Sequence, residues 1–108
     1  MNLTEKLNEN RNKRVKWIGG KAYMTPNPEV TCVDGFTISI QCQEHSYCTP
    51  RLNLPDVNNY EEFELGYPSE LDELISEYAE CEDTCNTVFP YVPRKVVEAL
   101  INKHGGIA

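Results

Sequence analysis

Hydrophobic and polar residues alternate strictly between positions 36 and 43. A period of two over this run predicts a β-strand that buries one face. The apolar positions are Phe36, Ile38, Ile40 and Cys42, and the polar positions are Thr37, Ser39, Gln41 and Gln43. Because charged side chains usually cover a face exposed to water, we expect a ligand or another subunit to cover this uncharged polar face.

Several other segments also have strand patterns. The Asp34-Gly35 pair predicts a hairpin turn in front of the 36–43 strand. Further strands are predicted at residues 14–18 and 21–25, around a Gly19-Gly20 turn, and at residues 60–67 and 86–92. In the 60–67 strand, Phe63, Leu65 and Tyr67 are expected to face the core. Pro90 favours an edge position or a bend for the last strand.

Residues 69–80 have the period of an amphipathic helix. The apolar residues recur at intervals of three and four: Leu71, Leu74, Ile75, Tyr78 and Ala79. Ser69 followed by Asp72 resembles a capping box, which predicts the start of the helix. The acidic residues, Asp72 among them, are expected on the solvent face.

A second helix is predicted to begin at Pro93, which suits the first helical position, and to end at His104. Its apolar face contains Val96, Val97, Leu100, Ile101 and His104. Gly105-Gly106 then supplies the C-terminal cap.

These elements predict an α+β fold, an antiparallel sheet of four or five strands with two helices packed on one face. The 108 residues, of which 40% are hydrophobic, suffice for one domain. We expect an N-terminal arm over residues 1–13, either a short polar helix or a frayed segment, followed by a single α+β domain over residues 14–108. No apolar run approaches the length of a membrane helix, and the first residues lack the apolar core of a signal peptide.

The net charge of −7 is distributed unevenly along the chain. Residues 1–25 carry six basic and two acidic side chains, whereas residues 26–92 carry Arg51 against fourteen acidic ones. An acidic region of this strength repels nucleic acid at long range. We therefore expect no direct nucleic-acid partner and no membrane partner. The acidic region is either a solvated surface or a surface for a basic partner.

The five cysteines, Cys32, Cys42, Cys48, Cys81 and Cys85, suggest reduced thiols, because the odd number argues against a complete disulfide framework. Cys81 and Cys85 have half of the spacing of a zinc site. Cys42, His45 and Cys48 could supply the other half, but their spacing is irregular. We expect no metal and no cofactor.

The sequence contains no hydrolase elbow, phosphate-binding glycine loop or zinc-protease motif. His45 lies three residues from both Cys42 and Cys48, whereas the partners in cysteine enzymes usually come from different elements. Paired carboxylates such as Glu61-Glu62 lie on predicted solvent faces. We therefore expect a protein that is not an enzyme.

The best candidate for a binding site is the segment from residue 45 to residue 51. Arg51 offers a planar donor fork that suits phosphate, Tyr47 offers a ring on which a base can stack, and Thr49 offers a hydroxyl. Asn27, between two prolines, and Gln41, on the polar face of the 36–43 strand, are the other candidate ligand-binding residues. The alternative is that Arg51 pairs with a nearby glutamate and Tyr47 covers the core.

Three stretches together resemble a group of small phage and prophage proteins, and within it the Thoeris anti-defence family of cyclic-nucleotide sponges. The stretches are residues 26–41 (PNPEVTCVDGFTISIQ), residues 47–51 (YCTPR) and residues 87–107 (TVFPYVPRKVVEALINKHGGI). The resemblance spans about residues 15–107 and implies a class of function only. It implies a non-enzymatic, oligomeric protein in the host bacterial cytoplasm that sequesters a cyclic ADP-ribose-type signal without degrading it.

Such a ligand is anionic and nucleotide-like, and a pocket shared between subunits would bring cations together around its phosphates. The basic candidates outside the N-terminal arm are Arg51, Lys21, Arg94 and Lys103. The competing hypothesis is an acidic protein inhibitor of a host defence complex that targets nucleic acid, similar to an anti-CRISPR protein. Its binding would weaken steeply with salt, which distinguishes the two hypotheses.

Overall fold

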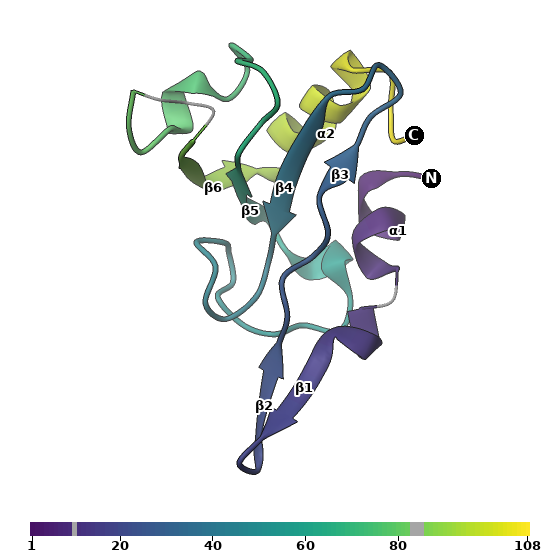
Figure 1. The fold of residues 1–108 in the computed structure, drawn as a ribbon, viewed down its shortest axis with the longest axis vertical. Coiled ribbons are helices and arrows are strands. Elements are labelled where there is room, and N and C mark those ends of the chain that lie inside the picture. Colours follow the sequence, from purple (N-terminus) through teal and green to yellow (C-terminus); the bar gives the residue numbers. More distant parts are fainter. Residues whose placement is uncertain (10, 83–85) are drawn as a thin grey trace.

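The computed structural model of the protein describes residues 1–9, 11–82 and 86–108. Its architecture is α+β, as predicted (Figure 1). The helices are α1 (Leu3–Asn8) and α2 (Arg94–Lys103), and three 3-10 helices are η1 (Arg11–Arg14), η2 (Val57–Asn59) and η3 (Ser76–Tyr78). The strands are β1 (Val15–Ile18), β2 (Lys21–Met24), β3 (Val30–Thr31), β4 (Thr37–Gln41), β5 (Glu62–Gly66) and β6 (Val88–Pro93).

The main sheet has the order β3-β4-β5-β6, and all its neighbours are antiparallel. The alternation of the 36–43 strand is confirmed, because its four apolar residues are buried. Ile40 lies opposite Leu65, and Leu65 lies opposite Phe89, so buried side chains face one another across three strands. β6 is an edge strand, as Pro90 predicted.

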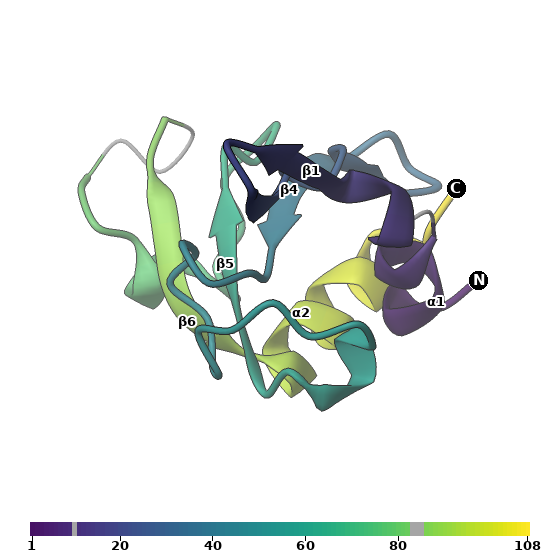
Figure 2. The same cartoon turned by 90° about the horizontal axis from the view of Figure 1, so that it is seen from below.

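Helix α2 packs against β5 and β6, and its predicted position is confirmed (Figure 2). Val97, Leu100 and Ile101 are buried in the core, and His104 is buried at the end of the helix. Gly105 and Gly106 follow with φ values of 89° and 88°. This left-handed conformation favours glycine and ends the helix as expected.

Helix α1, within the predicted N-terminal arm, belongs to the same hydrophobic core. Asn2 and Glu5 form a capping box at its start, and Leu3 and Leu7 are buried with the core residues of the sheet. The side chain of Asn8 accepts a hydrogen bond from the backbone of Val57 at 2.8 Å. The second helix of the fold is therefore α1.

The helix predicted over residues 69–80 is wrong. This segment contains only turns and η3, and Leu71 is exposed whereas Ile75 is buried. Asp72 was expected in solvent, but it is only 6% exposed, and its carboxylate accepts a hydrogen bond from the backbone of Leu74 at 3.0 Å. Such a local turn competes with helix formation. The acidic residues 70, 73, 77 and 80 would also repel one another at helical spacing.

The polar face of β4 is partly covered by the same chain, and its polar residues keep an intermediate exposure, so the expected ligand or subunit there stays a prediction. Gln41 and Gln43 donate hydrogen bonds to the backbone of residues 24–27, and the Ser69 hydroxyl accepts one from the backbone of Thr37 at 3.0 Å. Tyr67 was also predicted to face the core, but it is exposed. Its φ of 51° turns the chain outward at the end of β5.

Strands β1 and β2 form the predicted hairpin, which projects from the body of the molecule (Figure 1). They make a separate two-stranded sheet. Within the described part of the chain, no helix has the length and apolar character needed to cross a lipid bilayer.

Candidate functional site

The loop between β4 and β5 is fixed by internal hydrogen bonds. The buried Cys48 thiol donates to the carbonyl oxygens of Gln43 and Pro50, each at 3.3 Å. The backbone N–H of Thr49 donates to the carbonyl of Glu62 at 3.1 Å, so the loop is joined to the start of β5. The Thr49–Pro50 peptide bond is cis. The side chains that flank Cys48 are therefore held in defined positions.

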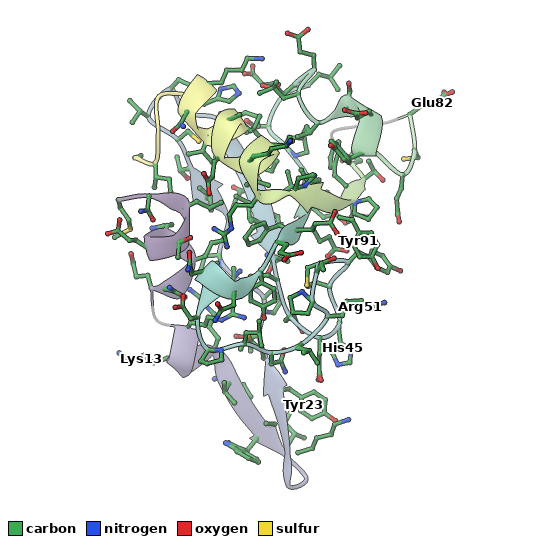
Figure 3. All side chains as sticks on the ribbon, turned by 180° about the vertical axis from the view of Figure 1, so that it is seen from behind. Lys13, Tyr23, His45, Arg51, Glu82 and Tyr91 are labelled. Carbon is green, nitrogen blue, oxygen red and sulfur yellow. The ribbon has the colours of Figure 1, made fainter. Side chains whose placement is uncertain are left out.

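Two side chains of this loop, Tyr47 and Arg51, together with Tyr91 of β6 form what we call the tyrosine–arginine site. The guanidinium carbon of Arg51 lies 5.2 Å from the centre of the Tyr47 ring. The rings of Tyr47 and Tyr91 have their centres 6.1 Å apart and their planes inclined by 43°. All three side chains are exposed, and each tyrosine is 40% exposed. Arg51 and Tyr91 lie along one edge of the molecule in Figure 3.

A β-bulge in β6 places Tyr91 in this site. The register between β5 and β6 shifts between Phe63 and Leu65, so β6 contains an extra residue at this point. Tyr91 has a φ of 54°, and its backbone N–H donates to the carbonyl of Tyr47 at 3.0 Å. A tyrosine in the left-handed region costs about 1–2 kcal/mol. Bulges and strained residues of this kind often re-aim side chains at binding sites.

Beneath the site, Glu64 is a half-buried carboxylate. Burial raises the pKa of Glu64, and the negative charge of Glu80 acts in the same direction. The backbone N–H of Tyr47 and the positive charge of Arg51 oppose this shift. Arg51 has no carboxylate partner within 4.0 Å among the described residues, so the expected alternative, a direct ion pair, does not form. Its fork remains available to an anion.

The other predicted site residues take different places. The Thr49 hydroxyl donates to a carboxylate oxygen of Glu62 at 2.6 Å, so its proton is engaged within the protein. Asn27 and Gln41 lie together: the Gln41 side chain donates to the Asn27 carbonyl at 2.9 Å and accepts from its N–H at 2.7 Å. The Asn27 side chain is buried and donates to the carbonyl of Ile40 at 3.0 Å. This pair fixes the approach to β3 and does not contact the tyrosine–arginine site.

Two of the four basic candidates are engaged in structural contacts. The Arg94 guanidinium donates to backbone carbonyls of Val57 and Tyr60 and to the Thr4 hydroxyl. Lys103 donates to a carboxylate oxygen of Asp72 at 3.1 Å. Arg51 remains free at the loop surface.

Lys21 occupies the hairpin tip, where its ammonium lies 5.4 Å from the centre of the Tyr23 ring. The hairpin projects from the body of the molecule, whereas Arg51 belongs to the loop after β4. Lys21 and Arg51 therefore lie on different surfaces of a single molecule.

The buried residues His104 and Asp72 form a polar cluster with the exposed residues Asp34 and Lys103, which we call the His104 cluster. The ring nitrogens of His104 lie 2.6 Å from Asp34 and 2.9 Å from Asp72, and its ring stacks on Phe36 at 3.9 Å. Because both ring nitrogens are hydrogen-bonded and one ring face is covered, His104 is not available to bind or act on a substrate. The sequence pointed to it only as a residue of the helix face.

The thiols show no catalytic or metal-binding arrangement within the described residues. Burial raises the pKa of Cys42 to about 11 and also raises the pKa of Cys48, which disfavours the reactive thiolate in both. The Nε2 atom of His45 faces Glu44 at 3.2 Å. The proposed half-site of Cys81 and Cys85 cannot be followed, because Cys85 lies outside the described residues.

Comparison with protein-family models, with curated protein sequences and with solved structures finds no match. The functional assignment therefore depends on the chemistry of the chain itself. Sequence reasoning found Tyr47 and Arg51 but missed Tyr91. The available signal was the proline in the edge strand, since Pro90 predicted a bend just where the bulge occurs.

Proposed function

We propose that this protein is a phage-encoded, non-enzymatic binding protein that captures a nucleotide-type anionic molecule at the tyrosine–arginine site. The ligand class follows the resemblance described above, a cyclic ADP-ribose-type or cyclic nucleotide immune signal. The protein acts in the cytoplasm of the bacterial host and sequesters the signal without cleaving it.

The observation that carries this proposal is the placement of Arg51 over the exposed ring of Tyr47, beside Tyr91. A nucleobase can stack on an exposed aromatic ring, a contact worth about 1–3 kcal/mol. The guanidinium fork matches the oxygen geometry of a phosphate. The two groups together fit a ligand that combines a base with a phosphate.

Preorganisation supports a binding role. The Cys48 thiol, the strand contacts of Thr49 and the backbone bond from Tyr91 to Tyr47 hold the loop before any ligand arrives. A site that is already ordered loses less conformational entropy on binding. The strained backbone of Tyr91 is consistent with this, because the strain fixes one aromatic wall of the site.

The chemistry near the site favours capture over turnover. The Cys48 thiol is buried between two carbonyl oxygens, and its raised pKa keeps it protonated. Glu64, the half-buried acid of the site, also has a raised pKa, but no described histidine or thiolate contacts it. A bound nucleotide would therefore meet stacking and ionic groups and no activated nucleophile.

Native mass spectrometry with a panel of cyclic nucleotides and cyclic ADP-ribose isomers tests the proposal. We expect an added mass equal to one intact ligand per site. Arg51→Ala and Tyr91→Ala should weaken binding by at least tenfold. Lys95→Ala and Tyr67→Ala remove an exposed cation and an exposed ring elsewhere and should leave binding unchanged. Failure of the whole panel to bind, or equal binding by Arg51→Ala, would overturn the proposal.

A separate observation supports a second candidate function, inhibition of a host defence complex. The segment before β6 exposes five glutamates, Glu70, Glu73, Glu77, Glu80 and Glu82. This surface suits an inhibitor that occupies the nucleic-acid channel of a host defence complex. Its binding should weaken steeply as the salt concentration rises, because salt screens the exposed charges of such a surface. A salt-insensitive interaction would exclude this function.

A further inference from the structure

A small recess lies where α1, η1 and the segment that leads into β3 meet (Figure 1). Its volume is about 130 Å³. The lining combines apolar side chains with two cations and two carboxylates: Leu7, Val30, Lys6, Arg14, Glu9 and Glu29. Leu7 and Val30 are buried, so one part of the lining belongs to the packed core. We call this cavity the Arg14 recess.

The guanidinium of Arg14 has donors that the protein does not use. The Nη2 atom donates to the carbonyl of Glu9 at 3.3 Å, and this is the one hydrogen bond of the Arg14 side chain among the described residues. The Nε atom is the one buried side-chain nitrogen or oxygen without a partner in the described part of the chain. Leaving a buried donor of a charged group unpaired is costly, and such a donor usually contacts water, an ion or a ligand. Arg14 is therefore placed to receive an acceptor from outside the chain.

The charges that line the recess do not neutralise one another across it. Within residues 1–9, 11–82 and 86–108, Arg14 has no carboxylate and Glu29 no cation within 4.0 Å. Lys6 and Glu9 are neighbours on α1, with Nζ and a carboxylate oxygen 4.0 Å apart. A simple anion would meet both carboxylates of the lining, and a simple cation would meet both basic groups. A molecule that carries both charges matches the recess better than either.

Hydrogen bonds hold the lining of the recess in place. The carbonyl of Arg14 accepts from the backbone N–H of Thr25 at 2.8 Å and from the Thr25 hydroxyl at 3.1 Å. Asn27, a candidate ligand-binding residue from the sequence, also lines the recess. Its side chain donates to the carbonyl of Ile40 at 3.0 Å, and its backbone N–H donates to the side chain of Gln41 at 2.7 Å. A cavity ordered in this way loses less conformational entropy when a ligand binds.

We propose that the Arg14 recess binds a small α-amino acid as its zwitterion, with the carboxylate at Arg14 and Lys6 and the ammonium at Glu29. Such a ligand makes charge-assisted hydrogen bonds of both signs at once. The volume sets the size of the ligand: at about 30 Å³ per water molecule, the recess holds about four waters, which suits glycine or alanine. The recess shares no residue with the tyrosine–arginine site, so the proposal does not depend on the proposed function.

A titration of the isotope-labelled full chain followed by NMR tests this proposal, with glycine, alanine, acetate and methylammonium as probes. Glycine and alanine should cause saturable shifts confined to the amide resonances of residues 6–9, 14, 27, 29 and 30. Acetate and methylammonium each carry one of the two charges and should bind about tenfold more weakly than glycine, because each loses one set of charged hydrogen bonds. Acetate that binds as tightly as glycine would overturn the proposal in favour of a plain anion site. Absence of saturation by all four probes would assign water as the partner of Arg14 and also overturn it.

Variants on the two sides of the recess separate binding from folding. Arg14→Met and Glu29→Gln should each weaken glycine binding about tenfold or more. Glu29 is exposed, so Glu29→Gln keeps the proposal testable even where Arg14→Met does not fold. Lys13→Met and Glu61→Gln are the matched controls, because they change an exposed cation and an exposed carboxylate outside the recess and should bind glycine like the wild type. Equal glycine affinity of Glu29→Gln and the wild type would overturn the proposal.

Discussion

The Nε2 atom of His104 lies 2.9 Å from a carboxylate oxygen of Asp72, 32 positions earlier in the chain. Both residues are buried, and Asp34 takes the other ring nitrogen at 2.6 Å. Because both partners are acceptors, both ring nitrogens donate, which requires the imidazolium form. The contact fixes Asp72, and with it the 69–80 segment, to the end of α2.

This pair predicts a pH-dependent stability. Burial alone would lower the pKa of His104, but the hydrogen bonds and charges of Asp34 and Asp72 outweigh it and raise the pKa above 6.5. The contribution of His104 to the free energy of unfolding is therefore complete below pH 6.5 and is lost as the pH rises through the raised pKa. Urea unfolding between pH 5 and pH 9 should show this loss, and His104→Gln should remove it. An unchanged profile in the variant would contradict this account of the cluster.

The His104 cluster also predicts how the free energy of unfolding falls at acidic pH. The pKa of Asp72 is lowered: burial would raise it, but hydrogen bonds from Leu74, His104 and Lys103 prevail. The contribution of Asp72 to the free energy of unfolding is present above pH 3.8 and is lost as the pH falls through the lowered pKa of Asp72. Asp72→Asn should flatten the acid limb of the unfolding profile. Glu73→Gln, an exposed neighbour, should leave the limb unchanged.

Arg11 is predicted to be a structural residue of the core. It is 2% exposed and donates hydrogen bonds to the carbonyls of Leu54 and Cys42 and to the Tyr60 hydroxyl. Arg11→Met should lower the free energy of unfolding by about 3 kcal/mol, because three buried acceptors lose their donor. Lys13→Met, an exposed cation nearby, should change it by less than about 0.5 kcal/mol. Thermal unfolding of both variants checks this.

Gly105 provides a test of the turn that ends α2. It has a φ of 89°, and an added Cβ would lie 3.1 Å from the Cβ of Val33. Gly105→Ala should therefore cost about 1–2 kcal/mol through backbone strain and crowding. Gly66→Ala is the matched control: its nearest atom would be 3.7 Å away, and its φ is ordinary. Equal unfolding midpoints for the two variants would contradict the assigned turn.

Local pattern predicted most of the fold. The alternation of residues 36–43, the Gly19-Gly20 hairpin and the helix before Gly105 each follow from the residues of one short segment, and all three are confirmed. The helix over residues 69–80 fails because Asp72 makes a local turn with Leu74 and a distant contact with His104. The distant contact cannot be predicted from the periodicity of the segment.

The candidate site was likewise predictable from the sequence only in part. Tyr47 and Arg51 are close in sequence and rigidly connected, so their pairing was predictable. Tyr91 reaches them only through a register shift in β6 and a backbone bond to Tyr47, both of which depend on tertiary structure. Asn27 and Gln41 were assigned to a ligand, whereas the Gln41 side chain bonds the Asn27 backbone and the Asn27 side chain donates to the carbonyl of Ile40 in β4.

Tyr91 should show a trade-off between stability and binding. Tyr91→Gly relieves the left-handed backbone strain, which should raise the free energy of unfolding by about 1 kcal/mol, less the lost ring contact with Tyr47. Ligand binding should fall at the same time, because one aromatic wall disappears. Tyr67→Gly relieves the same kind of strain at φ 51° and should leave binding unchanged. A destabilised Tyr91→Gly with full binding would contradict the role assigned to the bulge.

The most direct test of the central claim is an isothermal titration of the protein with the cyclic nucleotide or cyclic ADP-ribose isomer that binds best. The account predicts saturable binding by the wild type and at least tenfold weaker binding by Arg51→Ala, a loss of about 1.4 kcal/mol or more. The matched Lys95→Ala variant should bind like the wild type. Binding that is insensitive to both Arg51→Ala and Tyr91→Ala, or no binding of any member of the panel, would contradict it.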